Sequence, residues 1–184
     1  MALRNALLAA LVDRESSGYD LAKQFRSSVA NFWTCTPQQL YRELEKMEAE
    51  GLLSARVVKQ DKRPDKRIFS VTAEGRAALH AFTRRSPKPT TVRDELLIQV
   101  ESLAHGDVAS IRESIRTQLA ASRVRLDGYQ KRLADILGSR TDAEFLATGT
   151  RIGPYLTLHR GISFERENIA WAELALDVLT RRFP

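Results

Sequence analysis

A short helix followed at once by a basic hairpin is the feature of this sequence that most narrows its fold. Thr36 is placed to cap the helix, and Gln39 completes a capping box with it. The helix is expected to end at Gly51, after which two short strands are expected over residues 52–59 and 67–71. This order, a helix and then a basic hairpin, is typical of the groove-reading half of a winged helix.

The exposed face of this helix is predicted to contact DNA. Leu40, Leu44 and Met47 recur with helical spacing and form its buried stripe. The opposite face suits a DNA groove, because Gln and Arg side chains reach base edges in pairs and Tyr bonds a phosphate. The predicted contacts are Gln38, Gln39, Tyr41, Arg42 and Lys46. Four glutamates, which would repel DNA, lie toward the C-terminal half of the helix, and a merely solvated face is the alternative.

The hairpin is expected to hold DNA phosphates or to enter the minor groove. Within nine residues it carries five basic side chains against two acidic ones. The predicted contacts here are Lys59, Lys62, Arg63, Lys66 and Arg67. Further helices are expected over residues 3–12, 19–28 and 72–83. The full order is then helix, helix, helix, strand, strand, helix, which is a winged helix-turn-helix.

Several short strings occur in an order that is more specific than any one of them. They are Ser17-Gly18-Tyr19-Asp20-Leu21, Phe32-Trp33, Gln39-Leu40-Tyr41-Arg42-Glu43-Leu44, Glu50-Gly51-Leu52, Arg63-Pro64-Asp65-Lys66 and Thr72-Ala73-Glu74-Gly75-Arg76. With them the sequence resembles the PadR family of transcriptional regulators over most of residues 3–85. Arg160-Gly161-Ile162 and Ile169-Ala170-Trp171 resemble that family's helical C-terminal domain. The resemblance implies a homodimeric repressor, and for some members a response to small aromatic or hydrophobic molecules.

The charge distribution agrees with a nucleic-acid partner. The 184 residues carry a net charge of +6, and the pI is about 9.8. Residues 1–86 hold 15 basic and 10 acidic side chains, so most of the excess lies in the half with the hairpin. One cysteine excludes an intrachain disulfide and fits a reducing cytoplasm. No apolar stretch is long enough to predict a membrane span or a secretion signal.

The second half of the chain is predicted to be entirely helical. Two prolines within residues 85–91 mark a connector, so we expect a DNA-binding domain over 1–86 and a helical domain over 92–184. The longest helix is expected over 108–137, and the last over 155–183, after a break at Gly153-Pro154. Apolar spacing along the longest helix becomes a heptad seam. The seam is Ile111, Ile115, Leu119, Ser122, Leu126, Tyr129, Leu133 and Ile136.

A seam of this length needs partner helices of matching length, from the same chain or from a second one. The alternative to a homodimer is a hairpin formed by the two long helices of one chain. We favour a homodimer, because two helices alone leave apolar faces open and because two wings can read a palindromic site. The predicted dimer contacts are Ile115, Leu119, Leu126, Leu133, Leu156, Phe164, Trp171, Leu174 and Val178.

Signals for other chemistry are weak. The three histidines lack metal-ligand spacing, and no catalytic residue, metal or cofactor is predicted. Trp33 and Trp171 are candidate effector-binding residues, with core or interface anchors as the alternative. Cys35 is either a low-pKa sensor or inert packing. The predicted function is a sequence-specific, double-stranded-DNA-binding regulator; the alternatives are a winged-helix protein-interaction module and a small helical enzyme.

Overall fold

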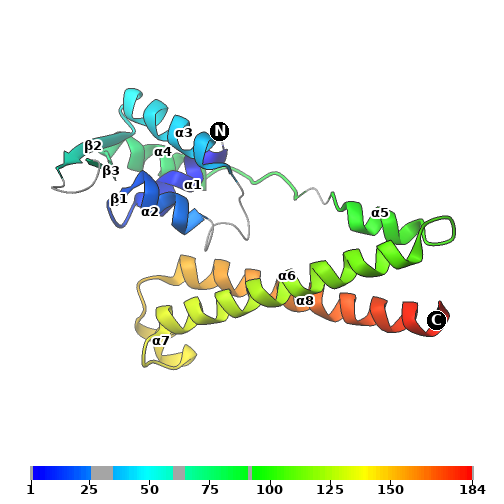
Figure 1. Ribbon diagram of the computed structural model, residues 1–184. Coiled ribbons are helices and arrows are strands. Elements are labelled where there is room, and N and C mark those ends of the chain that lie inside the picture. The colour runs from blue at the N-terminus through cyan, green and yellow to red at the C-terminus, as the bar shows by residue number, and fades with distance from the viewer. Residues whose placement is uncertain (1, 26–34, 60–64, 91–92, 184) are drawn as a thin grey trace. The chain divides into compact units, whose positions relative to one another are not determined.

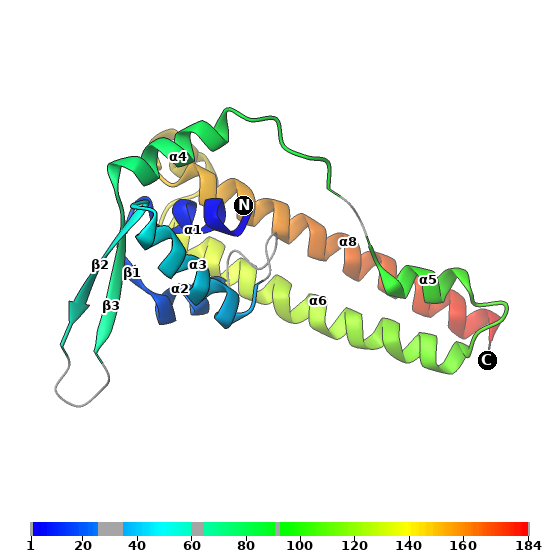
Figure 2. The same cartoon turned by 90° about the horizontal axis from the view of Figure 1, so that it is seen from above.

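The computed structural model describes residues 2–25, 35–59, 65–90 and 93–183. The chain divides into two compact units, residues 1–89 and 90–184. No helix within the described ranges is both long enough and apolar enough to cross a membrane. Figures 1 and 2 show the elements of each unit from two directions.

The N-terminal unit contains four helices and a small antiparallel sheet in its described part. The helices are α1 (Ala2–Leu11), α2 (Gly18–Gln24), α3 (Pro37–Ala49) and α4 (Ala73–Thr83). The strands are β1 (Ser16–Ser17), β2 (Leu53–Val58) and β3 (Lys66–Val71), in the order β1-β3-β2. The helices and the β2–β3 hairpin, hereafter the wing, follow the predicted order and confirm the winged-helix fold class.

Strand β1 was not predicted, because the sequence of this segment indicates only a turn. Ser16 pairs with Phe69 and Ser17 with Ile68, so the strand has two residues and no alternating pattern of its own. Ser17 also caps α2, since its hydroxyl oxygen accepts the Asp20 backbone N–H at 3.1 Å. The helix therefore begins at Gly18, and the predicted end at residue 28 lies outside the described residues.

One hydrophobic core holds the N-terminal unit together. It combines side chains from α1, α2, α3, β2 and β3, and the predicted stripe of α3 lies inside it. Its buried members are Leu7, Leu8, Leu11, Leu21, Ala22, Phe25, Leu40, Leu44, Met47, Leu53 and Phe69. Because α3 is fixed along this whole buried side, its opposite face is held toward solvent.

The C-terminal unit is helical throughout its described residues. It contains α5 (Glu95–Glu101), α6 (Val108–Leu137), α7 (Asp142–Thr148) and α8 (Ile152–Arg182). The bounds of α6 are those predicted, and α5 begins after a cap at Asp94. Helix α8 runs through Gly153-Pro154, where a break was expected. Pro154 lies in the first turn, whose N–H groups have no partner within the helix, so the proline costs no hydrogen bond.

Helices α6 and α8 lie side by side and antiparallel, joined by the short α7 (Figures 1 and 2). The α6 seam packs against an α8 seam that also alternates steps of three and four. That α8 seam is Tyr155, Leu158, Ile162, Glu165, Ile169, Ala172, Leu176 and Leu179. Leu156, Phe164, Leu174 and Val178, which are predicted dimer contacts, lie outside this seam and are exposed, because α8 carries two apolar faces and the hairpin buries only one of them.

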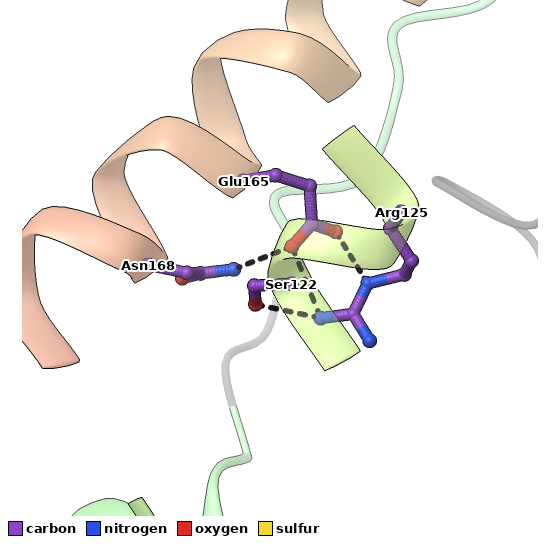
Figure 3. A network of polar contacts seen from close by, with 4 residues as sticks. All are labelled: Ser122, Arg125, Glu165 and Asn168. Atoms are coloured by element: carbon purple, nitrogen blue, oxygen red, sulfur yellow. Dashed lines mark hydrogen bonds and ion pairs between the residues drawn. The ribbon is translucent and has the colours of Figure 1, made fainter. Parts of the chain in front are cut away.

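A polar layer interrupts the apolar contact between the two long helices (Figure 3). Glu165 of α8 is 3% exposed and Ser122 of α6 is fully buried. Arg125 donates two hydrogen bonds to the Glu165 carboxylate, from Nε at 2.7 Å and from Nη2 at 3.0 Å. Its Nη2 also reaches Ser122 Oγ at 2.9 Å. Each buried polar group thus has a partner, which burial of a charge requires.

Candidate nucleic-acid interface

Local chemistry fixes the first turn of α3, the part expected to approach DNA. Gln39 N–H donates to Thr36 Oγ1 at 3.2 Å, and Thr36 N–H donates to Gln39 Oε1 at 2.9 Å. The predicted capping box is thereby confirmed. Because its amide oxygen serves the cap, the Gln39 side chain has mainly its amide N–H groups left to donate to another partner.

The remaining predicted contacts of α3 share its exposed face. Gln38, Arg42 and Lys46 are exposed, and Tyr41 is 41% exposed. The first turn carries no acidic residue. A row of donors beside an exposed phenol has the composition that contacts to base edges and phosphates use.

Most of the glutamates of α3 form ion pairs with arginines of the same unit. Arg4 of α1 forms ion pairs with Glu43 at 3.0 Å and with Glu50 at 2.6 Å. Glu48 pairs with Arg67 of the wing. Glu45 lines a groove described below. Three of the four glutamates are therefore engaged in ion pairs, with two arginines between them, which weakens the objection that they would repel DNA.

Three of the five predicted wing contacts, Lys59, Lys66 and Arg67, lie within the described residues. Lys59 is exposed at the end of β2. Lys66 and Arg67 lie on β3, where Lys66 Nζ is 2.8 Å from the Asp20 carboxylate and Arg67 pairs with Glu48. The other two predicted wing contacts, Lys62 and Arg63, lie outside the described residues.

A groove of about 720 Å³ lies between α2, α3 and β3. Tyr19 and Tyr41 line it, together with Asp20, Lys66 and Arg67. Gly18 makes the closeness of α2 and α3 possible, because a Cβ there would lie 2.4 Å from the Tyr41 ring. The groove thus joins the exposed face of α3 to the wing on one continuous surface of the N-terminal unit.

Asp20 connects α2 to the wing. The hydrogen bond from Lys66, and then that from the Ser17 hydroxyl, hold the pKa of the Asp20 carboxyl below its usual range. Ser17 Oγ donates to Asp20 Oδ2 at 2.7 Å. The sequence gave no sign that Asp20 would pair with Lys66, because the two residues are distant along the chain.

The described residues offer little support for other chemistry. Cys35 packs at the edge of the core, and burial raises the pKa of its thiol, which favours inert packing over a low-pKa sensor. No group of three or more His, Cys, Asp or Glu side chains in the described ranges is arranged to hold a metal ion. Of the two candidate effector residues, Trp171 is half-buried against the α6–α8 core, and Trp33 lies outside the described residues.

The predicted dimer contacts separate into two groups. Ile115 and Leu119 are buried within the α6–α8 hairpin, and Leu126 and Leu133 pack against its second apolar cluster. The hairpin thus occupies these four side chains within one chain. The others on α8 remain at the surface: Leu156 is 58% exposed, Phe164 48%, Leu174 62% and Val178 50%.

Two family models together match most of the chain. Residues 7–81 match the transcriptional regulator PadR-like family, and residues 92–180 match the virulence activator alpha C-terminal family. A probable transcriptional regulator of Mycobacterium tuberculosis is 34% identical over 99% of this chain and 100% of its own length. The negative transcriptional regulator PadR of Bacillus subtilis is 26% identical over 97% of this chain and 98% of its own length.

Several solved structures are similar to this chain over nearly its whole length. Bacillus subtilis PadR in complex with operator DNA has a TM-score of 0.77 at 26% identity, covering 97% of this chain and 99% of that one. The same protein with p-coumaric acid has a TM-score of 0.70 at 24% identity, covering 98% and 99%. The Vibrio cholerae virulence activator AphA has a TM-score of 0.71 at 28% identity, covering 97% and 98%.

Proposed function

Because the chain belongs to the PadR-like family of transcriptional regulators, we propose that it is a homodimeric repressor of a palindromic operator. Helix α3 enters the major groove with Gln38, Tyr41 and Arg42, and the wing lies along the flanking phosphates. The observation that carries this proposal is the continuous surface of the N-terminal unit. The exposed face of α3, with no acid in its first turn, borders the groove that β3 lines.

The homodimer rests on the second apolar face of α8. Leu156, Phe164, Leu174 and Val178 remain exposed after the hairpin has formed, and Trp171 is only half-buried. Apolar side chains at this spacing along one helix form a stripe that a second copy of the same helix can cover. Two-fold symmetry then presents two α3 helices to two half-sites, so the operator is palindromic.

The proposals that the protein represses and that an effector relieves repression are based on a related protein. The Bacillus subtilis relative is named a negative regulator, and it has been solved with p-coumaric acid. We infer repression here, relieved by a small aromatic or hydrophobic molecule, for which Trp171 is the candidate contact within the C-terminal unit. Such a molecule acts only if it binds one arrangement of the dimer better than another.

Selection of duplex sites from a random pool by the purified full-length protein tests this function. The expected result is a palindromic sequence, bound by two chains as counted by analytical ultracentrifugation of the complex. Recovery of no enriched sequence overturns operator binding. Recovery of one unsymmetric site bound by a single chain overturns the homodimer but leaves DNA binding intact.

A further inference from the structure

The cations of β3 are already paired with acids before any DNA is present. Lys66 Nζ lies 2.8 Å from Asp20 Oδ2, so β3 is joined to α2. Arg67 pairs with Glu48 and also lies over the Phe69 ring, 5.4 Å from its centroid, so β3 is joined to α3. Both pairs are partly exposed, with between 31% and 48% of each side chain accessible. They therefore lie where solvent, salt and phosphate all reach them.

Three other basic residues of the same unit differ from Lys66 and Arg67, although Arg4 and Arg56 are also paired with acids. Within the described ranges, Arg42, Lys46 and Lys59 form no ion pair and are exposed. An exposed cation with no acid beside it gains most from a DNA phosphate, because neutralising that phosphate releases a condensed counterion. A cation held by a carboxylate must first leave it or share it, so the gain is smaller.

We propose that Asp20 and Glu48 are internal counterions that limit DNA affinity: each holds one wing cation against the body of the N-terminal unit. The wing thereby neutralises fewer phosphates than its sequence charge suggests. Asp20 is a positioning residue that acts through Lys66, and Glu48 acts in the same way through Arg67. This inference rests on the proposed binding of DNA by α3 and the wing.

The geometry of Asp20 favours this role over a purely structural one. Helix α2 is capped by the Ser17 hydroxyl, which needs no carboxylate on Asp20. An amide at position 20 keeps an oxygen that can accept the Ser17 O–H, which now bonds Asp20 Oδ2 at 2.7 Å. Asp20→Asn therefore preserves shape and cap and removes the charge that holds Lys66; the same charge also attracts Lys23, so the effect is assigned to Lys66 by the double variant described below.

The test measures how full-length variants bind a random-sequence duplex as salt is raised. Asp20→Asn should free Lys66 for one more phosphate, steepening the slope of log K against log salt by about 0.9. At roughly 0.1 M salt this corresponds to a binding constant about eightfold higher. Asp13→Asn is the matched control, because Asp13 is exposed in the same unit and forms no ion pair within the described ranges.

A double variant separates release of Lys66 from a general change in charge. In a Lys66→Gln background, Asp20→Asn should change neither the slope nor the affinity beyond what Asp13→Asn does. Glu48→Gln, tested with and without Arg67→Gln, repeats the experiment on the second pair should Asp20→Asn fail to fold. Circular dichroism of each variant establishes folding before binding is measured.

The outcomes are distinct. Equal effects of Asp20→Asn and Asp13→Asn, or a gain that persists without Lys66, overturn the inference while DNA binding stands. A parent protein that binds neither the random duplex nor any selected site overturns the proposed function, and the inference with it. A gain that depends on Lys66, with a steeper salt slope, is the expected result.

Discussion

Replacing Arg125 by Met should destabilise the C-terminal unit more than replacing Glu165 by Leu, although both changes break the same ion pair. The two partners differ in solvation: the Glu165 side chain is 4% exposed and the Arg125 side chain 38%. Arg125→Met leaves a desolvated carboxylate with only the 3.5 Å contact from Asn168. Removing one partner of a buried pair in this way costs about 3–5 kcal/mol.

Glu165→Leu leaves the guanidinium partly in water and still bonded to Ser122, so we expect a loss of about 1–2 kcal/mol, within the range for an unsatisfied polar group. The double variant replaces the pair by apolar side chains, and its stability should lie within about 1 kcal/mol of the parent or above it. The stability losses of the two single variants therefore should not add up in the double variant, so the interaction energy between the two positions should be large.

Urea unfolding at one fixed protein concentration measures these differences. The two tryptophans are Trp33 and Trp171, so a Trp33→Phe background leaves Trp171 fluorescence to report on the C-terminal unit alone. A fixed concentration is needed because dimerisation couples stability to the amount of protein. Equal losses for the two single variants, or a larger loss for Glu165→Leu, would refute the argument that the buried carboxylate is the costly partner.

Three further outcomes are expected. Gly75→Ala should lower the free energy of unfolding by about 3 kcal/mol, because its Cβ would lie 2.2 Å from the Leu52 carbonyl oxygen. Gly128 has open space around it, so Gly128→Ala should be neutral or stabilising in the same thermal unfolding assay. The pKa of Asp20 is lowered in the folded protein, so its contribution to stability is present above the ordinary value of 3.8 and is lost as the pH falls through the lowered one; Asp20→Asn should flatten the acid side of the stability profile. Leu174→Asp should make the protein monomeric in sedimentation and weaken operator binding by a factor of about 10² or more, and a dimeric variant would place the subunit contact elsewhere.

The sequence predicts best what is encoded by neighbouring residues. The capping box at Thr36 and the bounds of α6 depend on residues within one or two turns, and the structure confirms both. The sequence did not indicate which of the two apolar faces of α8 the hairpin would bury. Phe164 and Glu165 are adjacent, and apolarity favours the first as the buried residue, whereas the hairpin buries the second against Arg125.

Most features of the candidate site that the sequence did not predict are ion pairs between residues that are distant along the chain. The sequence showed a run of wing cations but gave no sign that Lys66 would meet Asp20 or that Arg67 would meet Glu48. Such pairs depend on how α2, α3 and β3 pack, and charge patterns in one sequence do not determine them. The two-residue strand β1 is similar, because only its pairing with β3 makes it a strand.

The strand order β1-β3-β2 also sets when the N-terminal unit can form during synthesis. Ser16 and Ser17 leave the ribosome early, but their partners Phe69 and Ile68 follow only after both intervening helices and β2. Until then the sheet lacks its central strand and Phe69 is missing from the core. Nascent chains arrested before β3 should therefore be sensitive to protease. Once residue 89 has emerged, every element of this unit is available, so it can fold while α6 and α8 are still being made.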